Sequence, residues 1–202
     1  MLVLASPPGG GKTTITRELA GIDTHTVISV SATTRARRPG EVDGVHYYFV
    51  TPDNFQQMVD RNEMLEHALV YNKFMYGTPK APVEKALTSG RDVLFDIDWQ
   101  GNRKLAEIAP ADVVSIFLLP PSWEELERRL HHRAQDSEEE IERRLSKAKD
   151  EIAHYKEFQY VIVNNDLNDS IAQVRSILET ERTRRHRLLD VDNFVQTLEP
   201  SV

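Results

Sequence analysis

Short apolar runs alternate with longer amphipathic stretches along most of the chain. Runs that are apolar at nearly every position are typical of parallel strands covered on both faces, whereas apolar residues three and four apart are typical of helices. This pattern predicts an α/β sandwich with right-handed crossovers. The predicted strands are 2–5, 26–29, 92–97, 113–119 and 160–163, and the predicted long helices lie near 12–20, 100–108, 122–131, 138–156 and 168–188.

The alternation of apolar runs and amphipathic stretches is interrupted between residues 32 and 90. Residues 45–50 alternate like a half-exposed strand, turn signals stand at 39–40 and 43–44, and two short helices are expected at 52–60 and 80–89. We interpret this stretch as a mixed α+β lobe inserted after the second core strand. The expected organisation is core 1–31, lobe 32–90, core 91–131, lid region 132–144, and core helices with a tail at 145–202, whose last dozen residues are expected to be loosely held.

Composition narrows the class of protein. The 202 residues contain no cysteine, which excludes disulfides and thiolate metal sites and favours a reducing, cytoplasmic setting. No apolar run approaches the ~20 residues of a membrane span. The net charge of −7 disfavours broad binding to nucleic acid, so the basic end of the helix at 182–187 is better explained by the helix dipole. Neither a membrane nor nucleic acid is expected as a partner, and the oligomeric state does not follow from the sequence.

A glycine-rich loop follows the first apolar run. Residues 9–14 read Gly-Gly-Gly-Lys-Thr-Thr between a predicted strand and a predicted helix, which is the P-loop arrangement for binding ATP phosphates. Lys12 is expected to bridge the β- and γ-phosphates and the Thr13 hydroxyl to ligate Mg²⁺. The strict motif has glycine where Ser6 stands, and serine is unfavourable there if its φ is positive. The expected ATP-binding residues are Ser6, Pro7, Pro8, Gly9, Gly10, Gly11, Lys12, Thr13 and Thr14.

A second segment, residues 31–41, is rich in hydroxyls and arginines. Arg35 and Arg38 are three residues apart, so they can converge on one smaller phosphate, whose oxygens match planar guanidinium groups. Two phosphate sites on one compact chain suggest transfer between them.

Residues 31–49 read S-A-T-T-R-A-R-R-P-G-E-V-D-G-V-H-Y-Y-F, which resembles the nucleotide-monophosphate-binding segment of guanylate kinases. The resemblance continues in the same order through 62–68, 76–78, 96–101, 120–122 and 161–164. It implies an α/β fold with a P-loop NTPase-type parallel sheet core, an inserted mixed α+β GMP-binding lobe and a small lid. It also implies reversible transfer of the ATP γ-phosphoryl group to GMP, with Mg²⁺, giving ADP and GDP.

The resemblance assigns a GMP pocket. Glu66 is expected to accept from guanine N1–H and N2, and since adenine offers an unprotonated N1 there, such a site can reject it by ~10⁴-fold. A solvated helix carboxylate is the alternative for Glu66. Orienting the arginines without touching the nucleotide is the alternative for Glu41, and Tyr48 is expected to be a core aromatic. The 69–75 loop is about one residue longer than the family segment. The implied GMP-binding residues are Ser31, Arg35, Arg38, Glu41, Tyr47, Glu66, Tyr76, Thr78 and Asp96.

The resemblance also implies a set of charges for the transfer itself. The expected catalytic residues are Lys12, Arg38, Arg133 and Arg144, the last two from the lid. His132 and Ala134 flank Arg133 where the family has glycines. Pairing with glutamates one turn earlier on a surface helix is the alternative for Arg144.

Two more positions are assigned near the ends of strands. Asn164 is expected near adenine. Asp98 is expected to hold Mg²⁺ through water, because carboxylates after parallel strands belong at the ligand crevice.

Two other functions fit parts of this pattern. A guanylate-kinase-like module that binds phosphopeptides lacks a working P-loop, so Lys12, Thr13 and the lid arginines argue against it. A related kinase with a different phosphorylated acceptor is disfavoured by Glu66 and Asp96, which suit guanine.

Overall fold

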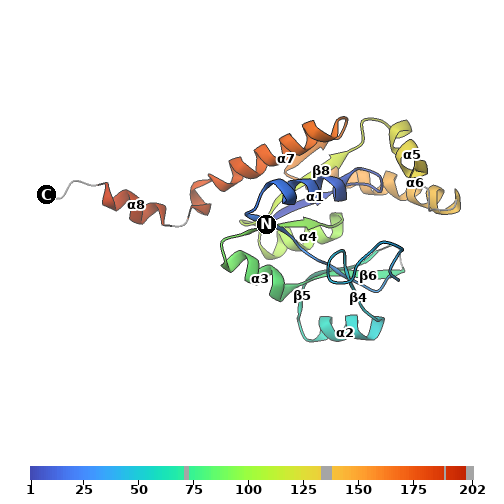
Figure 1. Cartoon of the computed structure of the whole chain (residues 1–202), viewed down its shortest axis with the longest axis horizontal. Helices are drawn as coiled ribbons and strands as arrows, with labels where there is room; N and C mark the ends of the chain where they lie inside the picture. The colour runs from blue at the N-terminus through green and yellow to red at the C-terminus, as the bar shows by residue number, and fades with distance from the viewer. Residues whose placement is uncertain (71–72, 133–137, 189, 199–202) are drawn as a thin grey trace.

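The computed structural model describes residues 1–70, 73–132, 138–188 and 190–198. Its main sheet is parallel, with strand order β2-β7-β1-β8-β9 (Figure 1). All five predicted strands are present, and their ends differ from the prediction by one residue or less. They are β1 (Leu2–Ala5), β2 (Thr26–Ile28), β7 (Asp92–Asp96), β8 (Val114–Leu119) and β9 (Tyr160–Val163).

The predicted long helices are also present, as α1 (Lys12–Ile22), α4 (Trp99–Ile108), α5 (Trp123–His132), α6 (Glu138–Ala153) and α7 (Leu167–Arg182). The last two end earlier than predicted and are followed by short 3₁₀ segments, η1 (His154–Glu157) and η2 (Arg185–Arg187). At the end of α7 the Thr183 hydroxyl donates to the Thr180 carbonyl at 2.7 Å. The Thr183 backbone N–H donates to the same carbonyl at 3.1 Å, so the last turn closes with an i→i+3 bond in place of the α-helical pattern.

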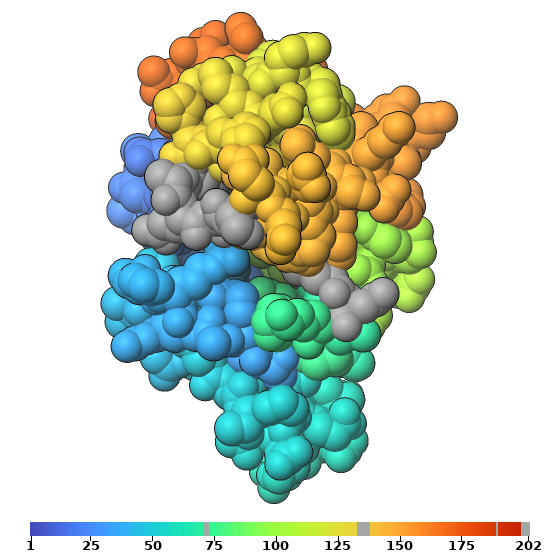
Figure 2. Space-filling model, turned by 90° about the vertical axis from the view of Figure 1, so that its right-hand side faces the viewer, coloured from blue at the N-terminus to red at the C-terminus, as the bar shows by residue number. Residues whose placement is uncertain are grey.

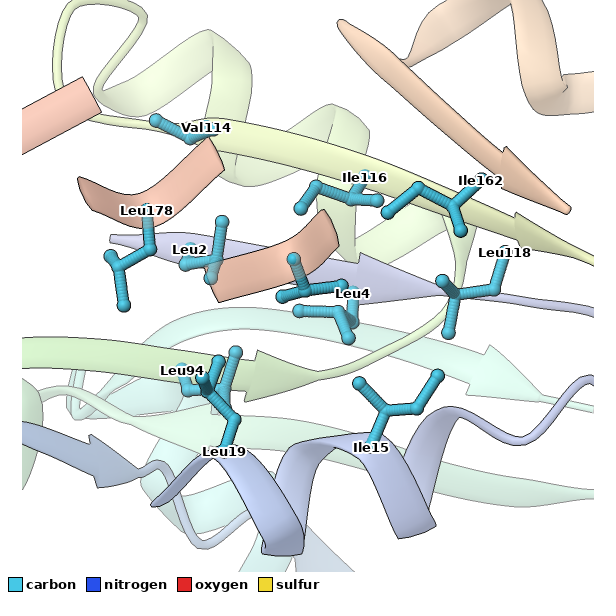
Figure 3. Close-up of a cluster of buried hydrophobic side chains, with 11 residues drawn as sticks. Leu2, Leu4, Ile15, Leu19, Leu94, Val114, Ile116, Leu118, Ile162 and Leu178 are labelled. Atoms are coloured by element: carbon cyan, nitrogen blue, oxygen red, sulfur yellow. The ribbon is translucent and has the colours of Figure 1, made fainter. Parts of the chain in front are cut away.

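Helices cover both faces of the main sheet because successive side chains of each strand point to opposite sides. Leu2 and Leu4 face one layer and Val3 and Ala5 face the other. The first layer packs against α1 and α7, and Figure 3 shows Leu94 beside Leu19 of α1 and Ile116 beside Ile162 of β9. The second layer packs against α4 and against the helix at 80–88. Burial on both faces explains the nearly continuous apolar runs.

A second, mixed sheet has the order β4-β3-β6-β5, in which β3 and β4 are parallel and the other two pairings are antiparallel. It lies within the stretch interpreted as an inserted lobe, and its mixed pairing fits that interpretation. The helices predicted at 52–60 and 80–89 are confirmed. The elements are β3 (Ala32–Thr33), β4 (Tyr48–Phe49), α2 (Pro52–Asp60), β5 (Met64–Val70), β6 (Phe74–Pro79) and α3 (Lys80–Thr88).

The strand predicted at 45–50 is wrong for residues 45–47. There the backbone turns, because the Gly44 N–H donates to the Tyr47 carbonyl at 2.8 Å and the His46 N–H donates to the Val42 carbonyl at 3.0 Å. Strands β5 and β6 were not predicted.

The carboxyl-terminal part forms a helix that the pattern did not predict. Helix α8 (Val191–Thr197) lies well away from the main sheet (Figure 1). Its Phe194 and Val195 side chains are exposed. Within the described ranges, no helix has the length and apolar character needed to cross a lipid bilayer.

Candidate active site

The loop between β1 and α1 has the backbone that its glycines allow. Gly9 and Gly11 have φ values of +85° and +93°, in the left-handed region that favours glycine. Helix α1 begins at Lys12 without a side-chain cap. Its first N–H groups are therefore open to an anion, as a phosphate-binding helix start requires.

Ser6 has an ordinary backbone conformation. Among the described non-glycine residues, positive φ is confined to Asn62 and Asp190, so Ser6 carries no such strain. The Ser6 hydroxyl donates to the Pro7 carbonyl at 3.0 Å. A Cβ at Gly10 would lie only 2.6 Å from the Ser6 Cβ. The small side chain of Ser6 therefore fills the space that the missing side chain of Gly10 leaves.

Asp96, at the end of β7, joins the two functional side chains of the loop. Its Oδ1 lies 2.9 Å from Lys12 Nζ, and its Oδ2 accepts from the Thr13 hydroxyl at 2.8 Å. Burial alone would lower the pKa of Lys12, but the Asp96 carboxylate outweighs burial and raises it. Lys12 is therefore a cation at every assay pH. Asp96, predicted for the GMP pocket, is in this structure a partner of the P-loop.

Asp98, predicted to hold Mg²⁺ through water, caps helix α4. Its Oδ1 accepts from the Gly101 N–H at 3.0 Å and its Oδ2 from the Gln100 amide at 3.2 Å. Aspartate is a favourable N-cap because its carboxylate satisfies an N–H group without an intrahelical partner. Its role toward a metal ion stays a prediction.

Arg35 is held in place by the lobe itself. Its guanidinium donates to both oxygens of Glu41, at 2.6 and 3.0 Å, and its Nε donates to the Tyr76 hydroxyl at 3.1 Å. Glu41 also accepts from the Arg38 backbone N–H at 2.7 Å. Burial would raise the pKa of Glu41, but these hydrogen bonds lower it. Glu41 thus orients Arg35, and its contact with GMP stays a prediction.

Tyr47 connects the lobe with the P-loop. Its ring lies 5.9 Å from the Tyr76 ring in an edge-on arrangement, and Arg35 lies over it at 5.4 Å. Burial and, to a smaller extent, the nearby Asp96 charge raise the pKa of Tyr47 to about 12, against the opposing charge of Lys12. Tyr48, the first residue of β4, packs against the lobe's apolar cluster, as predicted.

Glu66 is buried in the lobe, with 5% of its surface exposed. Its Oε1 accepts from the hydroxyl of Thr78, which is fully buried on the facing strand β6, at 2.7 Å. Its Oε2 lies 3.1 Å from where a Cβ would stand at Gly101, so α4 presents bare backbone to the carboxylate. Burial raises the pKa of Glu66 to about 7. The alternative of a solvated helix carboxylate is wrong. Ser31 is buried directly before β3.

The predicted lid residues are only partly described. Arg133 lies outside the described residues. Arg144, on α6, is buried, and its Nε lies 3.1 Å from Glu140 Oε1, so the predicted pairing one turn apart is present. Arg143 donates twice to the same Glu140, at 2.7 and 2.9 Å. On the face shown in Figure 2, α5 and α6 (yellow to orange) stand over the lobe of residues 32–70 (light blue to cyan).

Asn164 braces the P-loop. Its side-chain amide donates to the Gly10 carbonyl at 2.9 Å, and its oxygen accepts from the Ser170 hydroxyl at 2.9 Å. A Cβ at Gly11 would lie 2.3 Å from this amide. The structure therefore places Asn164 beside the loop that is predicted to hold the phosphates.

Glu151, on α6, was not predicted. Burial raises its pKa to about 7 against the opposing charge of Lys12, so the two groups are close enough to interact. Glu151 is seven residues after Arg144, and this spacing puts both on one helix face. A helical projection of residues 138–153 would have found it, since the buried residues of that face are Ile141, Arg144 and Ala148.

A cavity of about 350 Å³ lies elsewhere, at the amino-terminal edge of the main sheet, lined among others by Asp92, Arg182 and Arg187. The arginines in it are paired: Arg182 lies 2.6 Å from Asp92, and Arg187 lies 3.4 Å from Glu181. Open parallel sheets bind their ligands at the carboxyl ends of the strands, where Lys12 and Asp96 lie. This cavity is therefore separate from the candidate site.

A parallel sheet with helices on both faces and a Gly-Lys-Thr loop after its central strand is the architecture of the P-loop kinases. A family model for guanylate kinase matches residues 1–181. The chain is 57% identical over 198 residues to a guanylate kinase of Paramagnetospirillum magneticum, covering 98% of this chain and 92% of that protein. It is 54% identical to one of Rhizobium etli, covering 98% and 90%. The crystal structure of guanylate kinase from Anaplasma phagocytophilum matches with a TM-score of 0.84 at 36% identity, covering 100% of this chain and 96% of that one. The chain belongs to the guanylate kinase family, as the sequence motifs indicated.

Proposed function

We propose a set of residue roles for the reaction of this family, the ATP-dependent phosphorylation of GMP to GDP. The observation that carries the proposal is the junction of the two predicted phosphate sites. Tyr47 of the lobe is close enough to Lys12 of the P-loop, and to its partner Asp96 at the end of β7, for their charges to act on its hydroxyl. Two nucleotides bound on either side of this junction would meet at their phosphates.

In the donor site, the N–H groups of residues 9–14 and the Lys12 ammonium group bind the ATP phosphates. The Thr13 hydroxyl and the Asp96 carboxylate are 2.8 Å apart and offer the oxygen ligands that Mg²⁺ prefers. Among the described residues no cluster of three acidic or histidine side chains forms a cage, which suits an ion held mainly by phosphates and water. Bound there, Mg²⁺ would neutralise phosphate charge. Asn164 holds the loop in place through its hydrogen bond to the Gly10 carbonyl.

In the acceptor site, Arg38 binds the GMP phosphate together with Arg35 and the hydroxyls of Tyr47 and Tyr76. Glu41 sets the position of Arg35. Glu66 accepts from guanine N1–H and N2, and its bond from Thr78 fixes the carboxylate plane. Ser31 completes the base pocket.

Transfer needs little covalent work by the protein, because positioning and cancellation of charge on the moving phosphoryl group supply most of the acceleration. Lys12 and Arg38 provide two of these charges. Arg144, with Arg133 of the lid region, is proposed to provide more once α6 and the lobe approach each other and exclude water. We expect the reaction to take place in the cytoplasm.

The proposed function is tested by following ADP release with GMP, dGMP, AMP, UMP and CMP side by side. We expect turnover with GMP, and with the other bases kcat/KM lower by ~10³-fold or more, because each lacks the two adjacent donors that Glu66 requires. Faster turnover with AMP or a pyrimidine nucleotide than with GMP would contradict the proposal.

Replacing Glu66 by glutamine is expected to lower the GMP-to-AMP ratio of kcat/KM by about 10- to 100-fold, because a charged hydrogen bond to guanine contributes ~1.5–3 kcal/mol. The glutamine amide can also donate to adenine N1, which the carboxylate cannot. Steady-state kinetics with both nucleotides measure the ratio, and KM for ATP is the internal control. An unchanged ratio would exclude Glu66 from base recognition.

KM for GMP is expected to depend on pH through Glu66. The pKa of Glu66 is raised to about 7, so its carboxylate is lost as the pH falls through that value. Only the ionised form accepts from both guanine donors, so KM should rise toward about tenfold per pH unit below 7. Kinetics between pH 6.5 and 8.5 measure this, where most of the GMP phosphate is already a dianion because its second pKa is near 6. The Glu66→Gln variant should show a flat profile, and a sloping one would assign the effect to another group.

A further inference from the structure

Helix α4 of the core and strand β5 of the lobe are in direct contact at Glu66. Gly101, in the first turn of α4, approaches the Glu66 carboxylate closely enough that a Cβ would stand 3.1 Å from Oε2. One turn further along α4, Lys104 Nζ donates to the backbone carbonyl of His67, the residue after Glu66. The ammonium group of Lys104 is thus fixed to the strand segment that carries the carboxylate.

Three side chains act on the Glu66 carboxyl group, one from β6 and two from α4 and its N-cap. Thr78 donates from β6, Asp98 stands just before α4, and Lys104 comes from within α4. The pKa of Glu66 is raised to about 7, mainly by burial. The Asp98 charge adds to this rise, whereas the Thr78 hydrogen bond and the Lys104 charge oppose it. The pKa of the neighbouring His67 is lowered, first by burial and then by Lys104. The Lys104 charge therefore acts on both residues.

We propose that Lys104 is a positioning residue for guanine recognition, whose ammonium group, anchored on the His67 carbonyl, favours the ionised form of Glu66. The inference rests on the proposed role of Glu66 in reading guanine. Without this cation, a carboxylate buried between Thr78 and bare helix backbone, with Asp98 nearby, would hold its proton more tightly and would accept only one of the two guanine donors.

A purely mechanical role for Lys104 makes a different prediction. If the side chain only tied α4 to β5, any donor of similar reach would replace it. Glutamine keeps an N–H donor and removes the charge, whereas arginine keeps the charge. The Lys104→Gln and Lys104→Arg variants therefore separate the charge from the tether. Lys85→Gln is a matched control, because Lys85 is an exposed lysine near the end of α3.

The first measurement needs no nucleotide. The ¹³C chemical shift of the Glu66 side-chain carboxyl, assigned by its loss in Glu66→Gln, reports the ionisation of Glu66 in the free protein. In Lys104→Gln the pKa read from this signal should rise by about 0.5 to 1, whereas Lys104→Arg and Lys85→Gln should leave it unchanged. An unchanged pKa in Lys104→Gln, or an equal rise in Lys104→Arg, would overturn the inference.

The second measurement is KM for GMP against pH. In Lys104→Gln we expect a rise of roughly three- to eightfold at pH 6.5 and less than twofold at pH 9, with kcat and KM for ATP unchanged. An equal rise at both pH values would show a mechanical role and would overturn the inference. A shifted carboxyl signal with a wild-type KM profile supports the electrostatic part and refutes the assignment of Glu66 to guanine, so failure of the proposed function is distinguishable from failure of the inference.

Discussion

Replacing Lys12 by methionine is expected to lower kcat for GDP formation by on the order of 10³-fold, because a single cation on the transferring phosphoryl group contributes that much or more in phosphoryl transfer. Lys12 stands at the first turn of α1, 2.9 Å from Asp96. Methionine keeps most of the length of the side chain and removes only the ammonium group. Rapid-quench or coupled assays at saturating ATP and GMP measure the change in kcat.

The same variant tests whether the loss comes from chemistry or from folding. The Lys12 ammonium group also donates to the Ile97 carbonyl at 3.0 Å, so some loss of stability is expected when it is removed. Thermal unfolding should nonetheless remain cooperative, because the core layers around β1 do not contain Lys12. Arg17→Met, which removes an exposed cation further along α1, should retain kcat within twofold. A kcat for Lys12→Met within tenfold of the wild type would end the proposed role.

The parallel core was predictable for a simple physical reason. Strands such as β1 and β8 are buried on both faces, so their sequences are apolar at consecutive positions and cannot be mistaken for loops. The loop that follows β1 was predictable because its two left-handed positions need glycine. At these places the local sequence preference and the tertiary structure favour the same conformation.

Strand β5 was not predicted because a charged residue stands at a position where a strand usually buries an apolar one. Its most buried positions are Met64, Glu66 and Ala68, whereas Leu69 is exposed. A carboxylate thus occupies a buried position and a leucine faces outward, so the alternation of apolar and polar residues gives the wrong face. A site that recognises a base with a buried charge breaks the pattern from which strands are predicted.

The two aspartates after β7 show a second limit. Asp96 and Asp98 are two residues apart in an extended segment, so alternation alone directs them to the same side. The structure separates them: Asp96 reaches Lys12 and Thr13, whereas Asp98 caps α4. The position of Asp98 directly before a predicted helix was the available signal, because aspartate is among the preferred N-cap residues. Which of them reaches the P-loop depends on packing between α4 and β1 that local sequence does not encode.

Replacing Arg38 by alanine is expected to lower kcat/KM for GMP by ~10³-fold or more while ATP binding changes less than twofold. Arg35 and Arg38 differ in the contacts of their side chains. Arg35 is engaged by Glu41 and Tyr76. The exposed Arg38 guanidinium makes no hydrogen bond or ion pair with the residues that the structure describes, and only its backbone N–H is held by Glu41.

Because the Arg38 side chain makes no hydrogen bond or ion pair within the described part of the lobe, its removal should leave the fold intact. The acceptor phosphate would then lose one of the two arginines proposed to bind it. Arg37→Ala is the matched control, since Arg37 is an equally exposed neighbour, and its kcat/KM should stay within threefold of the wild type. Calorimetric titration with ATP and steady-state kinetics with GMP separate the two sites. Normal turnover in Arg38→Ala, or an equal loss in Arg37→Ala, would mean that the lobe binds the acceptor phosphate through Arg35 alone or through its general positive charge.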